Sequence, residues 1–106
     1  MARFENNYNI SEIRMSKKLH NLCTIGQDWF TNNIEIEMYP NEIIPDYIEV
    51  DKMLDTFEGK EMVIEEVVNG ILENLKEYKP KYISVISRVN DAQHLAVEVK
   101  AEYLED

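Results

Sequence analysis

The sequence predicts an α+β fold in which a small antiparallel sheet carries two helices on one face. Three observations support this class: apolar and polar residues alternate over 31–39, two helical patterns follow between 46 and 78, and two more strand patterns close the chain. Helices grouped between strands are typical of α+β proteins with an antiparallel sheet. A length of 106 residues predicts one domain.

The first 28 residues give the weakest pattern. Residues 1–10 are expected to form an arm or an edge strand, and 11–22 fit either a helical stripe or a strand. Residues 23–28 are predicted to form a turn, since Gly26 can adopt backbone dihedrals that other residues resist.

The central region gives clearer signals. Ile34, Ile36 and Met38 alternate with polar residues, which predicts a half-buried strand over 31–39 that ends at Pro40. Residues 41–45 are expected to be a loop. Asp46 is a candidate N-cap for a helix that ends at Gly59.

The last region combines a long helix with a hairpin. Apolar residues at 3.6-residue spacing predict a helix over 61–78, with acidic residues in its first turns, and Pro80 stops it. Strands are predicted over 81–89 and 95–103, joined by a turn at Asn90 and Asp91.

Composition narrows the function classes. Eleven basic against 21 acidic residues give a net charge of −10, which disfavours sequence-independent binding to nucleic acid. No apolar run is long enough to cross a membrane, and the N-terminus does not resemble a signal peptide. A single cysteine fits a reducing cytoplasm. A chain this short has little room for a deep pocket, so a ligand is expected at a subunit interface of a homo-oligomer.

Cys23 and Asp28 are the first candidate catalytic residues. A lone cysteine is most often a small buried hydrophobic residue. In a turn, however, a thiol is accessible, and a nearby acid could protonate the nitrogen of an electrophile that the thiolate attacks. Asp28 could equally serve only to form the turn.

Glu65 is the candidate binding residue. A glutamate in the first turn of a helix usually interacts with the helix dipole and with solvent. Glu65 also lies at the edge of the apolar stripe, where its carboxylate could accept two parallel N–H bonds from a guanine-like ring. His20 and His94 lack the spacing of a metal site, and the sequence contains no phosphate-binding loop.

These residues stand in a familiar order. Cys23, Gly26 and Asp28 precede the strand IEIEMYP, and then follow the segment VDKMLDTFEGKEMVIEE, the long helix and the strand KPKYISV. The order resembles the QueF family of tunnelling-fold (T-fold) proteins and is most similar to its short, archaeosine synthase-like branch. The resemblance covers residues 22–103 of a single T-fold domain spanning 1–106, with 1–21 as an N-terminal arm or edge strand.

The resemblance implies a covalent reaction on the nitrile of 7-cyano-7-deazaguanine. It places Cys23 as the nucleophile that forms a thioimide, Asp28 as the proton donor and acceptor, and Glu65 as the residue that binds the deazaguanine edge. It also implies a homo-oligomeric ring, pentameric or doubled, with ligand sites between subunits. The substrate would be the free base or a base within nucleic acid, in queuosine or archaeosine biosynthesis.

Three departures from the family pattern bear on the reaction. The spacing from Cys23 to Asp28 is shorter than usual, and Ile64 stands where the family has histidine before the glutamate. The lysine-rich NADPH segment, Glu-x-Lys-x-x-Lys, is replaced by DYIEVD at 46–51. Amidine formation with ammonia and no cofactor is therefore expected. The alternatives are an NADPH-dependent reductase that gives the 7-aminomethyl base and an inactive deazapurine-binding module.

Overall fold

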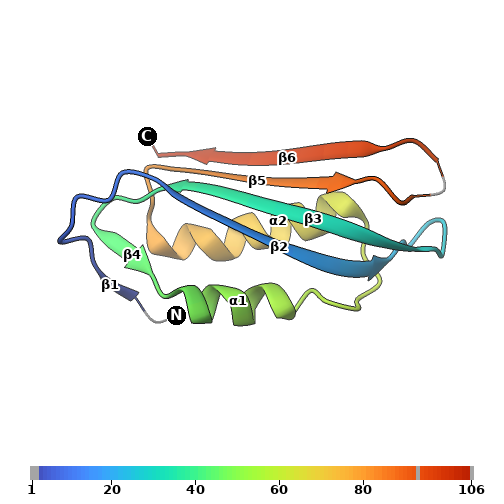
Figure 1. Ribbon diagram of the computed structural model, residues 1–106, viewed down its shortest axis with the longest axis horizontal. Helices are drawn as coiled ribbons and strands as arrows, with labels where there is room; N and C mark the ends of the chain where they lie inside the picture. The colour runs from blue at the N-terminus through green and yellow to red at the C-terminus, as the bar shows by residue number, and fades with distance from the viewer. Residues whose placement is uncertain (1–2, 93, 106) are drawn as a thin grey trace.

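The computed structural model describes residues 3–92 and 94–105, so residues 1–2 of the predicted arm lie outside it. The main sheet is antiparallel with strand order β2-β3-β5-β6, and both helices lie on one side of it (Figure 1). The predicted α+β class is confirmed. The elements of the sheet and its cover are β2 (Ile13–Leu22), β3 (Trp29–Tyr39), β5 (Tyr82–Val89), β6 (Val97–Leu104), α1 (Tyr47–Asp55), α2 (Ile64–Leu75) and the short 3-10 helix η1 (Lys76–Tyr78).

Strand β2 settles the ambiguous segment at 11–22. It pairs with β3 along its whole length, from Ile13 opposite Met38 to Leu22 opposite Trp29. Ile13 and Leu19 are buried toward the helices, whereas the residues between them are exposed or half-buried. Burial alternates along β2, but Lys17 and Asn21 occupy inward positions, so the residue types alone do not show the strand and pairing with β3 decides its conformation.

A second, two-stranded sheet corrects the prediction of a loop over 41–45. Strand β1 (Arg3–Glu5) pairs antiparallel with β4 (Ile43–Pro45). Ile44 is 3% exposed, so β4 contributes to the core. Two apolar residues between prolines are too few to show a period, and this strand depends on its distant partner.

Both helices are shorter than predicted. Asp46 caps α1 by accepting a hydrogen bond from the Ile48 N–H at 2.9 Å, but the helix ends at Asp55 rather than at Gly59. Helix α2 begins at Ile64, not at 61, because the segment before it runs beside β2. The Leu22 N–H donates to the Lys60 carbonyl at 3.1 Å, which uses this backbone for strand-like pairing.

A buried polar network lies beneath one end of the sheet. Ser87 Oγ donates to Asn32 Oδ1 at 2.7 Å, Asn32 Nδ2 donates to Asn21 Oδ1 at 2.8 Å, and Asn21 Nδ2 donates to the Phe57 carbonyl at 2.8 Å. All three polar side chains are fully buried. The network therefore fixes β5, β3, β2 and the segment before α2 relative to one another.

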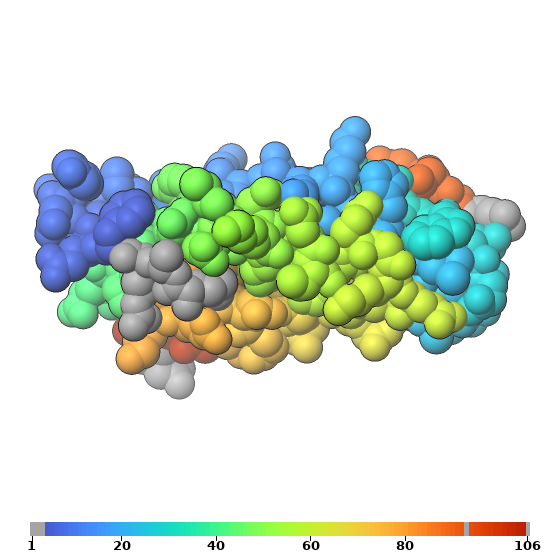
Figure 2. Space-filling view, turned by 90° about the horizontal axis from the view of Figure 1, so that it is seen from below, coloured from blue at the N-terminus to red at the C-terminus, as the bar shows by residue number. Residues whose placement is uncertain are grey.

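The molecule is elongated, with principal dimensions of 46 × 23 × 19 Å. Seen from the helical side, α1 and the chain that follows it run along the length, toward the end formed by residues of the β2–β3 turn (Figure 2). Within residues 3–92 and 94–105, no helix is long and apolar enough to span a membrane.

Candidate active site

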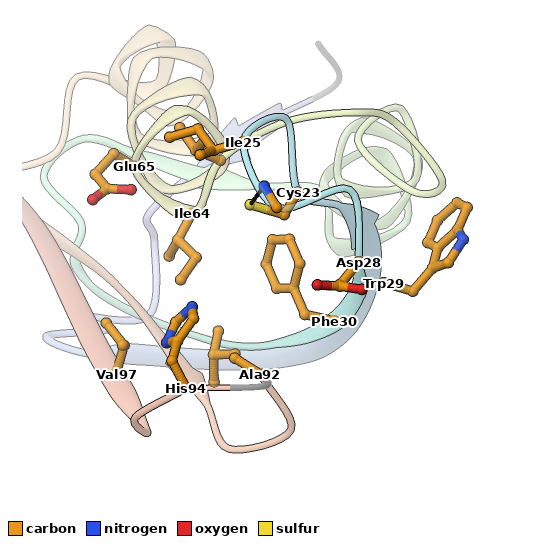
Figure 3. Close-up of a pocket in the computed structure, with 13 residues that line it drawn as sticks. Cys23, Ile25, Asp28, Trp29, Phe30, Ile64, Glu65, Ala92, His94 and Val97 are labelled. Atoms are coloured by element: carbon orange, nitrogen blue, oxygen red, sulfur yellow. Dashed lines mark hydrogen bonds between the residues drawn. The ribbon is translucent and has the colours of Figure 1, made fainter.

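The three predicted site residues line one cavity of about 350 Å³ at the end of the main sheet. Cys23 and Asp28 come from the β2–β3 turn, Glu65 comes from the first turn of α2, and the β5–β6 connection forms the opposite wall (Figure 3). Residues distant in sequence thus meet where three connections converge. The volume lies within the range of small-molecule sites.

The turn from Cys23 to Asp28 is closed by two backbone hydrogen bonds. The Cys23 N–H donates to the Asp28 carbonyl at 2.9 Å, and the Gln27 N–H donates to the Cys23 carbonyl at 2.8 Å. The turn is as predicted, but the positive φ, 57°, belongs to Gln27 rather than to Gly26. The Gln27 amide offsets this strain by donating to the Thr24 carbonyl at 2.9 Å and to Glu61 Oε1 at 2.6 Å.

This tight turn places the Cys23 thiol and the Asp28 carboxylate around Gly26. A methyl group added at Gly26 would lie 3.5 Å from Asp28 Oδ2 and 3.9 Å from Cys23 Sγ. The Cys23 thiol is half-buried, so Cys23 is not one of the fully buried core residues. The Gly26 N–H donates to Cys23 Sγ at 3.4 Å, a contact that stabilises negative charge on sulfur.

Glu65 and Glu66 are neighbours with different surroundings. Glu66 Oε1 accepts a hydrogen bond from the Val63 N–H at 3.1 Å and so caps the start of α2. Glu65 lines the cavity, and no hydrogen bond or ion pair joins it to any residue within 3–92 and 94–105. Its carboxylate is therefore available to a ligand.

Several lining residues were not anticipated from the sequence. Phe30 is 6% exposed and forms an apolar wall, and Trp29 is 60% exposed at the rim. His94 and Val97 line the cavity from the β5–β6 connection and the start of β6 (Figure 3). Their position depends on strand order, which no local sequence pattern specifies.

Charge around the cavity is acidic. No lysine or arginine occurs among the described residues that line it, whereas Asp28 and Glu65 do. Nearby, the Thr31 N–H and hydroxyl donate to Asp91 at 3.0 and 2.8 Å and hold the pKa of this carboxyl below its ordinary value. No group of three or more His, Cys, Asp or Glu side chains in the described parts of the chain could hold a metal ion.

Two proteins illustrate the similarity of this chain to solved structures. One is the archaeosine synthase QueF-Like in its apo form, with a TM-score of 0.80 and 26% identity, covering 88% of this chain and 93% of that one. The other is a protein assigned as dihydroneopterin aldolase (FolB) from Vibrio cholerae O1 biovar El Tor, with a TM-score of 0.71 and 14% identity, covering 89% and 97%. The second likeness shows the fold alone.

The comparisons confirm the T-fold and the resemblance to the QueF family expected from the sequence. No family model matches the sequence, and no curated protein matches it.

Proposed function

We propose that the chain is a nitrile-modifying enzyme that binds 7-cyano-7-deazaguanine and forms a covalent thioimide through Cys23. The observation that carries the proposal is the convergence of Cys23, Asp28 and Glu65 on one cavity. The likeness to the archaeosine synthase QueF-Like supports a function related to deazapurines.

In the first step, the Cys23 thiolate adds to the nitrile carbon. A carbon–sulfur bond forms, one π bond of the nitrile breaks, and the nitrogen takes up a proton to give the thioimide. Asp28 lies in the same turn as Cys23, where it takes the proton that the thiol loses and passes it to this nitrogen. The Gly26 N–H at 3.4 Å from sulfur favours the attacking thiolate.

Glu65 would orient the base. Its carboxylate, without a partner among the described residues, can accept two parallel N–H bonds from the edge of the deazaguanine ring. Phe30 offers an apolar surface to the ring. The described residues that line the cavity include no lysine or arginine, which favours the free base over a phosphate-bearing nucleic acid.

In the second step, ammonia would attack the thioimide and release an amidine. Hydride transfer from NADPH is the alternative, and the residues aligned with the family's NADPH segment do not fit a phosphate. Asp46 and Glu49 are acidic, and Lys17 is already paired with Asp51 and, at 2.8 Å, with Asp55 on α1. The reaction needs a reduced thiol, which agrees with a cytoplasmic location.

The test is incubation of the protein with 7-cyano-7-deazaguanine, followed by intact mass spectrometry. We expect a mass increase equal to one whole substrate molecule, together with thioimide absorbance. Since the chain has a single cysteine, loss of this adduct in Cys23→Ala assigns the nucleophile without ambiguity. An unmodified wild-type protein, or an unchanged adduct in Cys23→Ala, contradicts the proposal.

Two matched variants test the binding role of Glu65. Glu65→Gln should weaken binding at least tenfold, because a neutral amide cannot accept both N–H bonds, whereas Glu66→Gln should retain affinity. Trp29 is the only tryptophan and lies at the rim, so its fluorescence reports binding in both variants. Equal affinities would contradict the role of Glu65.

Adding ammonium or NADPH to the preformed adduct then separates the alternatives. Release of the amidine with ammonium supports the proposal. Release of the aminomethyl base with NADPH supports the reductase. Substrate binding without an adduct identifies the inactive binding module.

A further inference from the structure

His94 lines the same cavity as Cys23, Asp28 and Glu65. It lies on the β5–β6 connection, and its ring projects toward Ile64 across the cavity from Cys23 (Figure 3). The other histidine, His20, is elsewhere: it stands on β2, and its Nδ1 lies 2.8 Å from Glu58 Oε1. The chain therefore has one imidazole at the site and one outside it.

The hydrogen bond made by the His94 ring favours a role for this side chain as a general base. Nδ1 lies 3.3 Å from the Leu95 carbonyl oxygen. Since a carbonyl oxygen only accepts, this contact requires a proton on Nδ1 and leaves the lone pair on Nε2. The Nε2 lone pair of this tautomer is the group that a general base uses to take up a proton.

The proposed reaction contains a second proton transfer, separate from the one proposed for Asp28. Asp28 belongs to the same turn as the sulfur and acts when the nitrile nitrogen gains a proton. The incoming ammonia brings a further nitrogen, which becomes positively charged as it bonds to carbon and must lose a proton. A base on the wall opposite Cys23 would face a nucleophile that attacks the thioimide carbon from the side away from the sulfur.

We propose that His94 is the general base of the second step and takes the proton from the ammonia nitrogen that attacks the thioimide. This inference rests on the proposed function. The new carbon–nitrogen bond forms, the carbon–sulfur bond breaks with its electron pair returning to Cys23, and Nε2 of His94 holds the proton. The imidazolium then returns this proton to the thiolate or to water, so that nitrile and ammonia together give the amidine.

The test separates the two steps in His94→Ala, with His20→Ala as the matched control. Adduct formation in His94→Ala should stay within about twofold of wild type, while release by ammonium should slow by about 100-fold or more. Added imidazole should restore part of the release rate. His20→Ala should behave as wild type in both steps.

The outcomes distinguish the two proposals. Normal release from the His94→Ala adduct, or an equal loss in both steps, overturns the role of His94 and leaves the thioimide proposal standing. Failure of ammonium to release the wild-type adduct overturns both the amidine reaction and the role of His94. A wild-type protein that forms no adduct overturns the proposed function itself, and with it this inference.

Discussion

Gly26 occupies the position between the two groups that are proposed to react together. In Gly26→Ala the new methyl group would contact both Asp28 Oδ2 and Cys23 Sγ at ordinary van der Waals distances. We expect thermal stability to change by less than about 0.5 kcal/mol, because the residue is exposed and its φ is not positive. Adduct formation should slow at least tenfold, since the methyl group obstructs proton transfer to the substrate.

Mass spectrometry of the adduct over time measures this effect, and a melting curve checks the fold. A variant that reacts at the wild-type rate would show that Cys23 and Asp28 do not act across this position.

At the residue scale, the sequence predicted the chemical type of the candidate site residues better than their positions in the fold. Cys23, Asp28 and Glu65 were proposed from residue type and a family-like order, and they do share a cavity. The sequence suggested only a metal-binding role for His94, and that role was not favoured, because His94 lies far from His20 along the chain and neither has a partner at metal-ligand spacing. Its proximity follows from the pairing of β5 with β3 and β6, which local patterns do not encode.

At the scale of elements, the buried hydrogen-bond network of Asn21, Asn32 and Ser87 links the main sheet to the segment before α2. Asn32→Leu removes both its contacts and leaves Asn21 Oδ1 and Ser87 Oγ without these partners. Each buried polar group left unsatisfied costs about 1–3 kcal/mol, so denaturant unfolding should show a loss of that order. Asn33→Leu, on the opposite face of β3, is the control and should cost less, because only one hydrogen bond, to the Arg88 carbonyl, is lost.

If Asn32→Leu were as stable as wild type, the network would not hold these strands together. A second readout is adduct formation. It should fall in Asn32→Leu even where the protein is folded, because the network holds the segment that leads into the first turn of α2, where Glu65 lies.

Helix α2 approaches the segment after α1 closely at Gly70. A Cβ atom there would lie 2.7 Å from Phe57 Cε1, and Phe57 is buried. Gly70→Ala should therefore destabilise the protein by about 1–3 kcal/mol through overpacking, although alanine is favoured over glycine in a helix by about 1 kcal/mol. In a Phe57→Leu background the same substitution should become neutral or stabilising. An equal cost in both backgrounds, measured by denaturant unfolding, would rule out this contact as the cause.

Asp91 joins the start of β3 to the β5–β6 connection and should make stability depend on pH. Hydrogen bonds from Thr31 lower the pKa of Asp91 in the folded state below its ordinary value of 3.8. Above that value the stabilisation is fully present, and it is lost as the pH falls through the lowered pKa, since the unfolded chain takes up the proton first.

Thermal unfolding of wild type and Asp91→Asn as a function of pH tests this linkage. The wild type should be the more stable at neutral pH, and the difference should shrink as the pH falls below the ordinary value of 3.8 and vanish below the lowered pKa of the folded state. A difference that persists in acid would assign the effect to packing rather than to the carboxylate.

The elements also show what local sequence can predict. The alternation in β3 and the Asp46 cap were sufficient for a strand and a helix start, because both depend on near neighbours. Strand β4 and the late start of α2 were missed. The first depends on β1 and the second on pairing with β2, so both are consequences of contacts distant in sequence.

For the whole molecule, exposed apolar side chains at the end of the sheet and the net charge have opposite effects on association between copies of the chain. Ile25, Trp29 and Leu95 are 86%, 60% and 73% exposed, and β6 pairs with another strand on one edge only, which favours contact with a second copy. A charge of −10 on each chain opposes that contact through repulsion, which salt screens over about 10 Å at 0.1 M. If sites are shared between subunits, assembly and activity should therefore rise together with ionic strength.

Sedimentation velocity across a salt series measures the assembly, and adduct formation in the same samples measures the site. The mass should increase from low to high salt as a multiple of the 12.5 kDa chain. Leu95→Ser removes one apolar side chain from the rim without adding charge, so it should shift the series toward smaller species at every salt concentration. A mass of one chain throughout, with adduct formation independent of salt and dilution, would show that a single chain contains the complete site and that the charge does not limit its function.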